Sequence, residues 1–220
     1  MNSFISILIL IATCQMTLAA EPLKVACVGD SITYGHGVKN RGTRSYPAQL
    51  RVMLGEDYVV RNYGRSGSSV QRDAKRSYWD APQFKAVLKW QPDIIVIKLG
   101  TNDACQDNGN WKGKEAFKKA YEELLAVFRE LPSKPKLYLC TPAPSFPGNP
   151  GRREVVMEPI VVPTIKEIAN EQNLEVIDIY SAMKGKANLF PDKLHPNAGG
   201  LKLLASEVFK VMTSEEEVSK

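Results

Sequence analysis

Short apolar runs alternate with helix-length amphipathic segments along most of this chain, and no other feature constrains its fold as strongly. The runs are rich in β-branched residues, short enough for strands and too apolar for exposed loops. They span residues 24–28, 58–62, 93–99, 136–140 and 175–179. This alternation predicts an α/β fold, in which a five-stranded parallel sheet is covered by helices on both faces.

The intervening segments show the spacing of helices. Apolar residues recur every three or four positions over 117–128 and again over 201–212, so both stripes are expected to face the sheet. Residues 155–173 also look helical, but Pro159 and Pro163 predict a delayed or kinked start. Residues 141–151 are rich in proline and glycine, which predicts a loop.

The first 19 residues differ from the rest of the chain. Residues 4–12 form an almost continuous apolar run that is too short to span a bilayer, and small residues at Thr17 and Ala19 suit cleavage after Ala19. We therefore predict a signal peptide over 1–19, a secreted or periplasmic location, and one domain over 20–220 without stable membrane insertion. The lack of a basic residue near Met1 weakens this prediction, and acylation of Cys14 is an alternative.

Charge and cysteine content exclude several function classes. The formal charge is +5, but basic and acidic residues are interleaved, which argues against nucleic acid as a partner and leaves a solvated basic face or a mild preference for anionic substrates. After signal cleavage three cysteines remain without metal-ligand spacing, so neither a metal site nor a disulfide framework is predicted. Cys27 and Cys140 lie in strand-like runs and should be buried, whereas Cys105 has no assigned role.

Chemistry-bearing residues follow several of the predicted strands, and ligands of open parallel sheets bind beyond the carboxyl ends of their strands. The chain has two histidines, His36 and His195, and an imidazole is the usual base for activating a serine. Asp192 lies three residues before His195 in a segment bounded by prolines, so its carboxylate can hold the Nδ1 proton and leave Nε2 free. The alternative is a loop that only caps the following helix.

Ser31 directly follows the first strand and a glycine-aspartate pair, which makes it a candidate nucleophile, although alone it would be an ordinary helix-capping serine. Gly67 lacks a Cβ that would block a ligand from its N–H, and Asn102 offers a side-chain amide. The N–H groups of Ser31 and Gly67 together with the Asn102 amide are expected to form an oxyanion hole. Gly67 and Asn102 are alternatively explained as turn residues.

These motifs, Gly29-Asp30-Ser31, Gly67, Gly100-Thr101-Asn102-Asp103 and Asp192-Lys193-Leu194-His195, resemble the blocks of the SGNH (GDSL-like) hydrolase family, in family order. The resemblance covers nearly the whole mature chain. It implies a flavodoxin-like three-layer α/β/α sandwich, ester hydrolysis through an acyl-enzyme, and no metal or organic cofactor. The G-x-S-x-G motif of the rival α/β-hydrolase fold does not occur around Ser31, where Thr33 replaces the last glycine.

The substrate is less constrained. The segment from Gly29 to Gly35 and residues 45–50 are similar to members of this family that act as carbohydrate acetylesterases, which implies O-deacetylation of a glycan or a small glycoside. The alternatives are a lysophospholipase, a short-chain lipid esterase or thioesterase, and a glycan-binding module without turnover. Trp79 and Trp111 are candidates for sugar stacking or plain packing, and Arg65 is a candidate contact for an anionic group. The sequence does not define the oligomeric state.

Overall fold

The computed structural model describes residues 21–107 and 109–214, and the predicted signal peptide therefore lies outside the described residues. Five parallel strands form one sheet in the order β2-β1-β3-β4-β5. Their bounds are β1 Leu23–Gly29, β2 Tyr58–Gly64, β3 Ile94–Lys98, β4 Lys136–Cys140 and β5 Glu175–Ile177. The five-stranded parallel sheet predicted from the sequence is confirmed.

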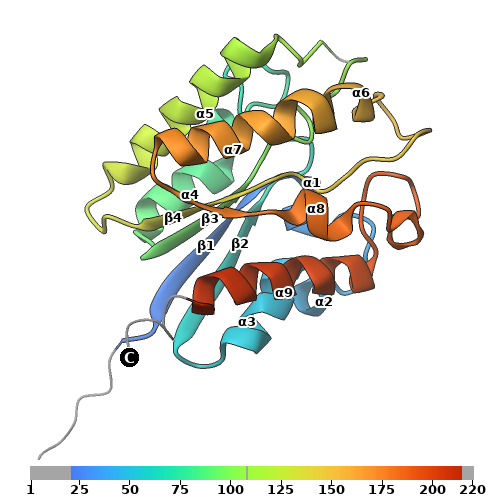
Figure 1. The fold of residues 1–220 in the computed structure, drawn as a ribbon. Helices are drawn as coiled ribbons and strands as arrows, with labels where there is room; N and C mark the ends of the chain where they lie inside the picture. Colours follow the sequence, from blue (N-terminus) through green and yellow to red (C-terminus); the bar gives the residue numbers. More distant parts are fainter. Residues whose placement is uncertain (1–20, 108, 215–220) are drawn as a thin grey trace, which may run out of the picture.

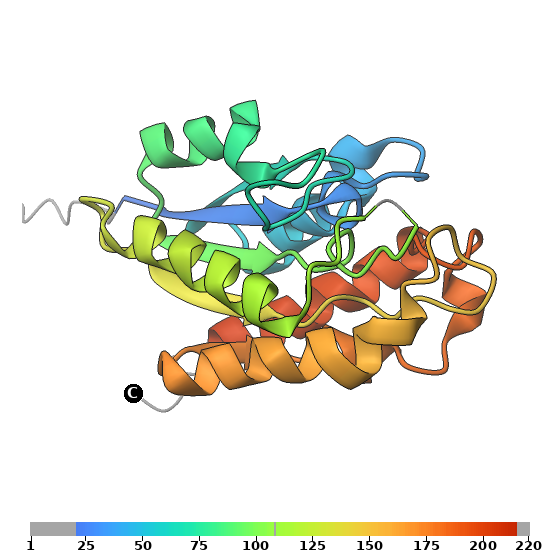
Figure 2. The same ribbon diagram turned by 90° about the horizontal axis from the view of Figure 1, so that it is seen from above.

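Helices cover both faces of the sheet and complete a three-layer α/β/α sandwich (Figure 1). On one face lie α4 (Pro82–Trp90), α5 (Lys114–Arg129) and α7 (Val162–Glu171), of which α5 and α7 run side by side (Figure 2). On the other face lie α3 (Tyr46–Leu54) and α9 (Ala198–Ser214), which pack against each other. The remaining short helices are α1 Ser31–Tyr34, α2 Arg41–Arg44, α6 Glu154–Val156, α8 Ile179–Met183 and two 3₁₀ turns, Tyr78–Asp80 and Ala187–Leu189.

Each face of the sheet buries its own apolar cluster. The apolar stripes predicted in residues 117–128 and 201–212 lie on α5 and α9, and Phe117, Leu124, Leu201 and Leu204 are almost fully buried. A cluster on each face is what a buried parallel sheet requires, because both sides of every central strand must be shielded from water.

Two local predictions need comment. The strand predicted to run to Ile179 ends at Ile177, because the Asp178 side chain accepts a hydrogen bond from the N–H of Ser181 and starts α8 at Ile179. The predicted disturbance by Pro159 and Pro163 is confirmed. Pro159 lies in a π-helical turn, Met157–Val161, and Pro163 lies in the first turn of α7, where its missing N–H costs nothing.

The direction of the elements determines where the loops gather. The loops after β1, β2 and β3 all lie at the carboxyl edge of the sheet, and α9 begins at this edge. Because α9 runs back against the strand direction, its end at Ser214 lies near the start of β1, at the opposite edge (Figure 1). The predicted loop 141–151 follows β4 and is confirmed as irregular chain.

Candidate functional site

The structure brings Ser31, His195 and Asp192 into one hydrogen-bonded chain. The Ser31 Oγ lies 2.9 Å from Nε2 of His195, although 164 residues separate them, and Nδ1 of His195 lies 2.6 Å from Oδ2 of Asp192. Ser31 is 6% exposed, and the His195 side chain is 17% exposed, so both are sheltered yet reachable. Oδ2 of Asp192 accepts a hydrogen bond from the ring N–H at Nδ1, which leaves Nε2 able to accept the serine proton.

The turn that carries Asp192 is organised by its own carboxylate. Oδ1 of Asp192 accepts hydrogen bonds from the backbone N–H groups of Leu194, at 3.0 Å, and His195, at 2.6 Å, and Lys193 takes a left-handed conformation with φ of +67°. Partial desolvation raises the pKa of the Asp192 carboxyl, but the hydrogen bonds from His195 and Leu194 outweigh it and the net pKa is lowered. The carboxylate is therefore held ionised beside the imidazole.

The expected oxyanion-hole residues lie on loops that hydrogen bonds join at the same edge, and their role stays a prediction. The backbone N–H of Arg65 donates to the carbonyl of Gly29 at 3.0 Å, and Nδ2 of Asn102 donates to the carbonyl of Ser68 at 2.9 Å. These bonds join the loop after β2 to the loops after β1 and β3. Gly67 has φ of +81°, a backbone conformation that favours glycine, so its identity follows from the turn as well as from ligand access.

Arg153 is a residue of this site that the sequence analysis missed. Its Nε donates to the carbonyl of Thr101 at 2.9 Å, and Nη2 approaches Oδ1 of Asn102 at 3.4 Å. The residue is 7% exposed, and its Nη1 has no hydrogen-bond partner among the described residues. Because Oδ1 of Asn102 faces the Arg153 guanidinium, the Nδ2 end of the same amide points away from Arg153. Arg153 follows an irregular loop, and no sequence pattern signals its burial.

Lys98 and Asp30 form a second missed feature, a fully buried ion pair directly beneath Ser31. The Lys98 Nζ lies 3.3 and 3.2 Å from the two carboxylate oxygens of Asp30 and 3.4 Å from Oγ1 of Thr101. Oδ1 of Asp30 also accepts the N–H of Ile32 at 2.8 Å and so caps the turn that carries Ser31. A lysine inside the apolar run of β3 was the available signal, because a buried ammonium requires an acidic partner.

Asp103 ties the loop after β2 to the loop after β3. Its Oδ1 accepts hydrogen bonds from the Ser69 hydroxyl and from the backbone N–H groups of Val70, at 2.9 Å, and Gln71, at 3.3 Å. Complete burial raises the pKa of this carboxyl to about 6, despite the opposing effect of these hydrogen bonds. This clamp holds the Gly67 loop against Asn102.

The second histidine also lies at the site. The ring of His36 lies 4.5 Å from the ring of His195, centroid to centroid, at an angle of 47°. Both rings line a cavity of about 370 Å³ together with Lys39, Arg44 and Asp192. The volume of this cavity lies in the range of small-molecule sites.

Three further candidates differ in their surroundings. One face of Trp79 is covered by the Arg72 guanidinium, 3.6 Å from the ring centroid, and its Nε1 donates to the Val70 carbonyl. These contacts favour packing, and sugar stacking on Trp79 stays a prediction. Trp111 packs on Phe117, and sugar stacking there stays a prediction. Arg65 donates to the carbonyl of Ser77 at 3.0 Å, and its contact with an anionic group also stays a prediction.

The predicted burial of Cys27 and Cys140 is confirmed. Cys27, Cys140 and also Cys105 are buried free thiols. Burial raises the pKa of Cys27 to about 12 and that of Cys140 further still, so neither supplies a thiolate at neutral pH. Within residues 21–107 and 109–214 no cluster of three His, Cys, Asp or Glu side chains has the arrangement of a metal site. In the same part of the chain no helix combines the length and hydropathy of a membrane span.

This arrangement has the parts that nucleophilic acyl substitution needs. The hydroxyl is hydrogen-bonded to an imidazole, and the imidazole is oriented by a carboxylate, so the hydroxyl can be activated as a nucleophile. The side-chain amide of Asn102 is a donor that can stabilise an oxyanion.

Solved structures share this fold. A putative arylesterase from Agrobacterium tumefaciens superposes with a TM-score of 0.70 at 21% identity, covering 87% of this chain and 99% of that one. A carbohydrate acetylesterase family member from Sinorhizobium meliloti superposes with a TM-score of 0.69 at 19% identity, covering 87% and 98%. At these identities the likeness extends to the fold, and the flavodoxin-like sandwich expected from the sequence is confirmed.

Two curated relatives are longer proteins. An acetylxylan esterase of Xylanibacter ruminicola is 32% identical over 203 residues, which cover 84% of this chain and 42% of that protein. A multidomain esterase of Ruminococcus flavefaciens is 29% identical over 221 aligned positions, which cover 84% of this chain and 28% of that protein. The chain thus spans less than half the length of either relative.

The model of the GDSL-like lipase/acylhydrolase family matches residues 27–203, a span that holds every residue of the site described above. The resemblance seen in the sequence motifs is therefore confirmed, and the chain belongs to the GDSL-like lipase/acylhydrolase family.

Proposed function

We propose that the protein is a serine esterase that removes O-acetyl groups from carbohydrate through an acyl-enzyme. One observation carries the proposal, the continuous hydrogen-bonded chain from the Ser31 hydroxyl through the His195 imidazole to the Asp192 carboxylate, with links of 2.9 and 2.6 Å. In this proposal Ser31 is the nucleophile, His195 the general base and acid, and Asp192 the group that orients and stabilises the imidazolium.

The first half of the reaction forms the acyl-enzyme. Nε2 of His195 takes the hydroxyl proton while Oγ of Ser31 attacks the ester carbonyl carbon, and the carbonyl oxygen becomes an oxyanion. The backbone N–H groups of Ser31 and Gly67 and Nδ2 of Asn102 stabilise that charge. The carbon–oxygen bond to the alcohol then breaks, and the alcohol leaves with the proton from Nε2.

The second half regenerates the enzyme. Water takes the place of the alcohol beside His195, Nε2 accepts one of its protons, and the hydroxide attacks the acyl carbon. The oxyanion forms again in the same hole and collapses with release of acetate, while His195 returns the proton to Oγ of Ser31. The reaction consumes one ester and one water and releases one alcohol and one acetate.

The choice of carbohydrate acetate rests on two supports. The name of the 32%-identical relative, an acetylxylan esterase, favours acetylated polysaccharide. The groups next to Asn102 are polar, namely the Ser68 carbonyl and the buried Arg153 guanidinium, and a polar surround suits a short acyl group better than a long alkyl chain. We also propose, from the apolar run in residues 4–12, that the protein is exported to where such polymers occur.

Hydrolysis of p-nitrophenyl acetate by the wild type and by Ser31→Ala tests the catalytic assignment. We expect the variant to lose at least about a thousandfold in kcat, because the nucleophile is gone. The matched control is Ser181→Ala, which changes an exposed serine that hydrogen-bonds Asp178 on α8. Equal rates for the wild type and Ser31→Ala would refute the assignment and favour a glycan-binding module.

The substrate class is tested by product release. Acetate is measured from acetylated xylan and acetylated pectin, and fatty acid is measured from a lysophospholipid. The proposal expects acetate from the polysaccharides at rates well above fatty acid release. Fatty acid release without acetate release would instead assign a lysophospholipase.

A further inference from the structure

The proposed mechanism divides the site into two halves. The oxyanion donors surround the carbonyl oxygen on the side of Asn102, whereas the leaving oxygen must lie within hydrogen-bond distance of Nε2 of His195 to receive its proton. The alcohol half of the ester therefore lies on the His195 side of the site, and the residues beside this ring are the candidates for contact with the alcohol.

The space beside His195 is the cavity of about 370 Å³ shared by its ring and that of His36. Two cationic side chains, Lys39 and Arg44, line it, and both residues are exposed. The carboxylate in the lining belongs to Asp192, whose oxygens already accept hydrogen bonds from the His195 ring and from two backbone N–H groups. The cavity thus offers two cations to a ligand, while its acidic group is engaged within the protein.

The local sequence concentrates positive charge around this cavity. Residues 31–55 contain four basic side chains, Lys39, Arg41, Arg44 and Arg51, and no Asp or Glu. The segment therefore has a formal charge of +4, in a chain whose total formal charge is +5. A segment of one sign beside a catalytic residue raises the local concentration of anionic ligands.

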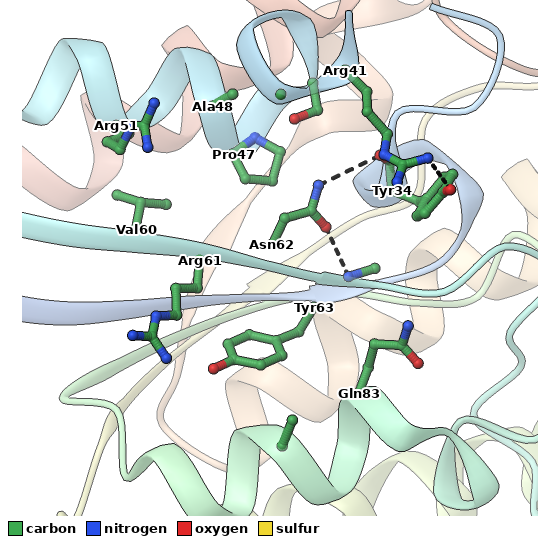
Figure 3. A pocket seen from close by; sticks show the side chains of 14 residues that line it. Tyr34, Arg41, Pro47, Ala48, Arg51, Val60, Arg61, Asn62, Tyr63 and Gln83 are labelled. Atoms are coloured by element: carbon green, nitrogen blue, oxygen red, sulfur yellow. Dashed lines mark hydrogen bonds between the residues drawn. The ribbon is translucent and has the colours of Figure 1, made fainter.

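Arg44 of α2 lines the first cavity, whereas Arg41 and Gly42 of the same helix line a second cavity, of about 590 Å³. Its lining includes Arg41, Arg51 and Arg61, and no carboxylate is among its described lining residues. Figure 3 shows Arg41 and Arg51 toward opposite ends of this cavity, with the polar side chain of Asn62 between them. Because Arg41 and Arg44 lie three residues apart on α2, one at each cavity, the cations of the two cavities are neighbours.

The second cavity is also connected to the turn that carries Ser31. Arg41 donates through Nη1 to the hydroxyl of Tyr34, and its guanidinium lies 4.1 Å from the centre of that ring. Nδ2 of Asn62 donates to the carbonyl of Thr33 at 2.8 Å. Both contacts join a residue that lines the second cavity to α1, the short helix that begins at Ser31.

We propose that the alcohol half of the substrate is a uronate-containing glycan. One carboxylate next to the scissile acetate binds Lys39 and Arg44, and the polymer continues across α2 so that a further carboxylate binds Arg41 and Arg51. This inference rests on the proposed deacetylation of carbohydrate and specifies its substrate class.

The experiment compares acetylated polyuronate with the same polymer whose carboxylates were reduced to alcohols before acetylation to equal acetyl content. We expect kcat/KM to be about tenfold higher for the acidic polymer at low salt, since two exposed ion pairs contribute modestly each. The ratio should fall toward one in about 0.5 M salt, where surface charges are screened. An equal kcat/KM for both polymers at low salt overturns the inference, as does faster hydrolysis of an O-acetylated sialoside than of the acidic polymer.

The double variant Lys39→Met, Arg44→Met locates the effect. Rates on each polymer are divided by the rate of the same variant on p-nitrophenyl acetate. The acidic-to-reduced ratio should fall by about threefold relative to wild type, because the contact with Arg41 and Arg51 remains. The control Lys85→Met, Lys119→Met removes two exposed cations on α4 and α5, on the other face of the sheet, and should keep the wild-type ratio. Equal falls in both variants would assign the preference to net charge and overturn the proposed site.

The two proposals fail in different ways. If p-nitrophenyl acetate is hydrolysed but neither polymer releases acetate, the carbohydrate function itself is wrong. If both polymers release acetate at equal rates, the function stands and the uronate site is wrong.

Discussion

Replacing Lys98 by methionine should destabilise the fold by about 3 to 5 kcal/mol, because it leaves the Asp30 carboxylate buried without its counter-charge. Both side chains of the pair have no exposed surface, and the closest oxygen of Asp30 lies 3.2 Å from Nζ. At that distance and an effective dielectric constant of about 20, the attraction amounts to about 5 kcal/mol, which the desolvation of both groups largely offsets in the native protein. Removing only the lysine removes the attraction but leaves the desolvation of the carboxylate.

The free energy of unfolding, measured by urea denaturation at constant pH, tests this reasoning. The double variant Asp30→Asn, Lys98→Met removes both charges and should recover most of the loss, since the penalty belongs to the unpaired carboxylate. Glu123→Gln is the control, because it breaks the exposed ion pair with Arg72 and should change the free energy of unfolding by less than about 1 kcal/mol. A loss below about 1 kcal/mol in Lys98→Met, or no recovery in the double variant, would refute the argument.

Asn102→Ala should lower kcat about 10²-fold to 10³-fold, because it removes an oxyanion donor. Arg153→Met should lower kcat about tenfold in the wild type. It should have no further effect in the Asn102→Ala variant, because Arg153 acts by orienting the Asn102 amide. Steady-state kinetics of the double-mutant cycle checks both, and additive losses would mean that Arg153 acts elsewhere. Asp192→Asn should lower kcat about 10³-fold to 10⁴-fold, because the new amide places an N–H against Nδ1 and favours the wrong tautomer; an unchanged kcat on p-nitrophenyl acetate would exclude this role. The free energy of unfolding should fall by about 3 kcal/mol as pH rises from about 4 to above 6, since folded Asp103, with its pKa of about 6, keeps a proton that the unfolded chain has lost. Urea titrations of Asp103→Asn from pH 4 to 7.5 should lack this fall, and an identical pH profile in the variant would contradict it.

The sequence predicted the elements that have a clear period and the residues that end strands. Parallel strands place their carboxyl ends at one edge, so Ser31, Asn102 and the Asp192-His195 pair could be expected to meet there without knowledge of any contact. The strand that ends at Ile177 was predicted two residues too long, because the apolar Ile179 continues the strand pattern although it belongs to α8. Burial alone does not distinguish a strand from a short helix.

The missed residues depend on contacts between loops. Arg153 reaches Thr101 and Asn102 only because the loop after β4 folds back over the loop after β3, and this irregular path leaves no periodic signal. The helices α3 and α4 were not predicted, since each has only nine residues and a short apolar stripe. Their positions are decided by tertiary packing, which overrides weak local preference.

The two ends of the described chain lie at the edge of the sheet opposite Ser31, because β1 starts there and α9 returns to it. An affinity tag, a solid support or a fused protein can therefore be attached before β1 or after α9 without standing in the path of a long polysaccharide. The same geometry suits an enzyme that works as one domain among several, because the connections to other domains would lie at the edge of the sheet opposite Ser31.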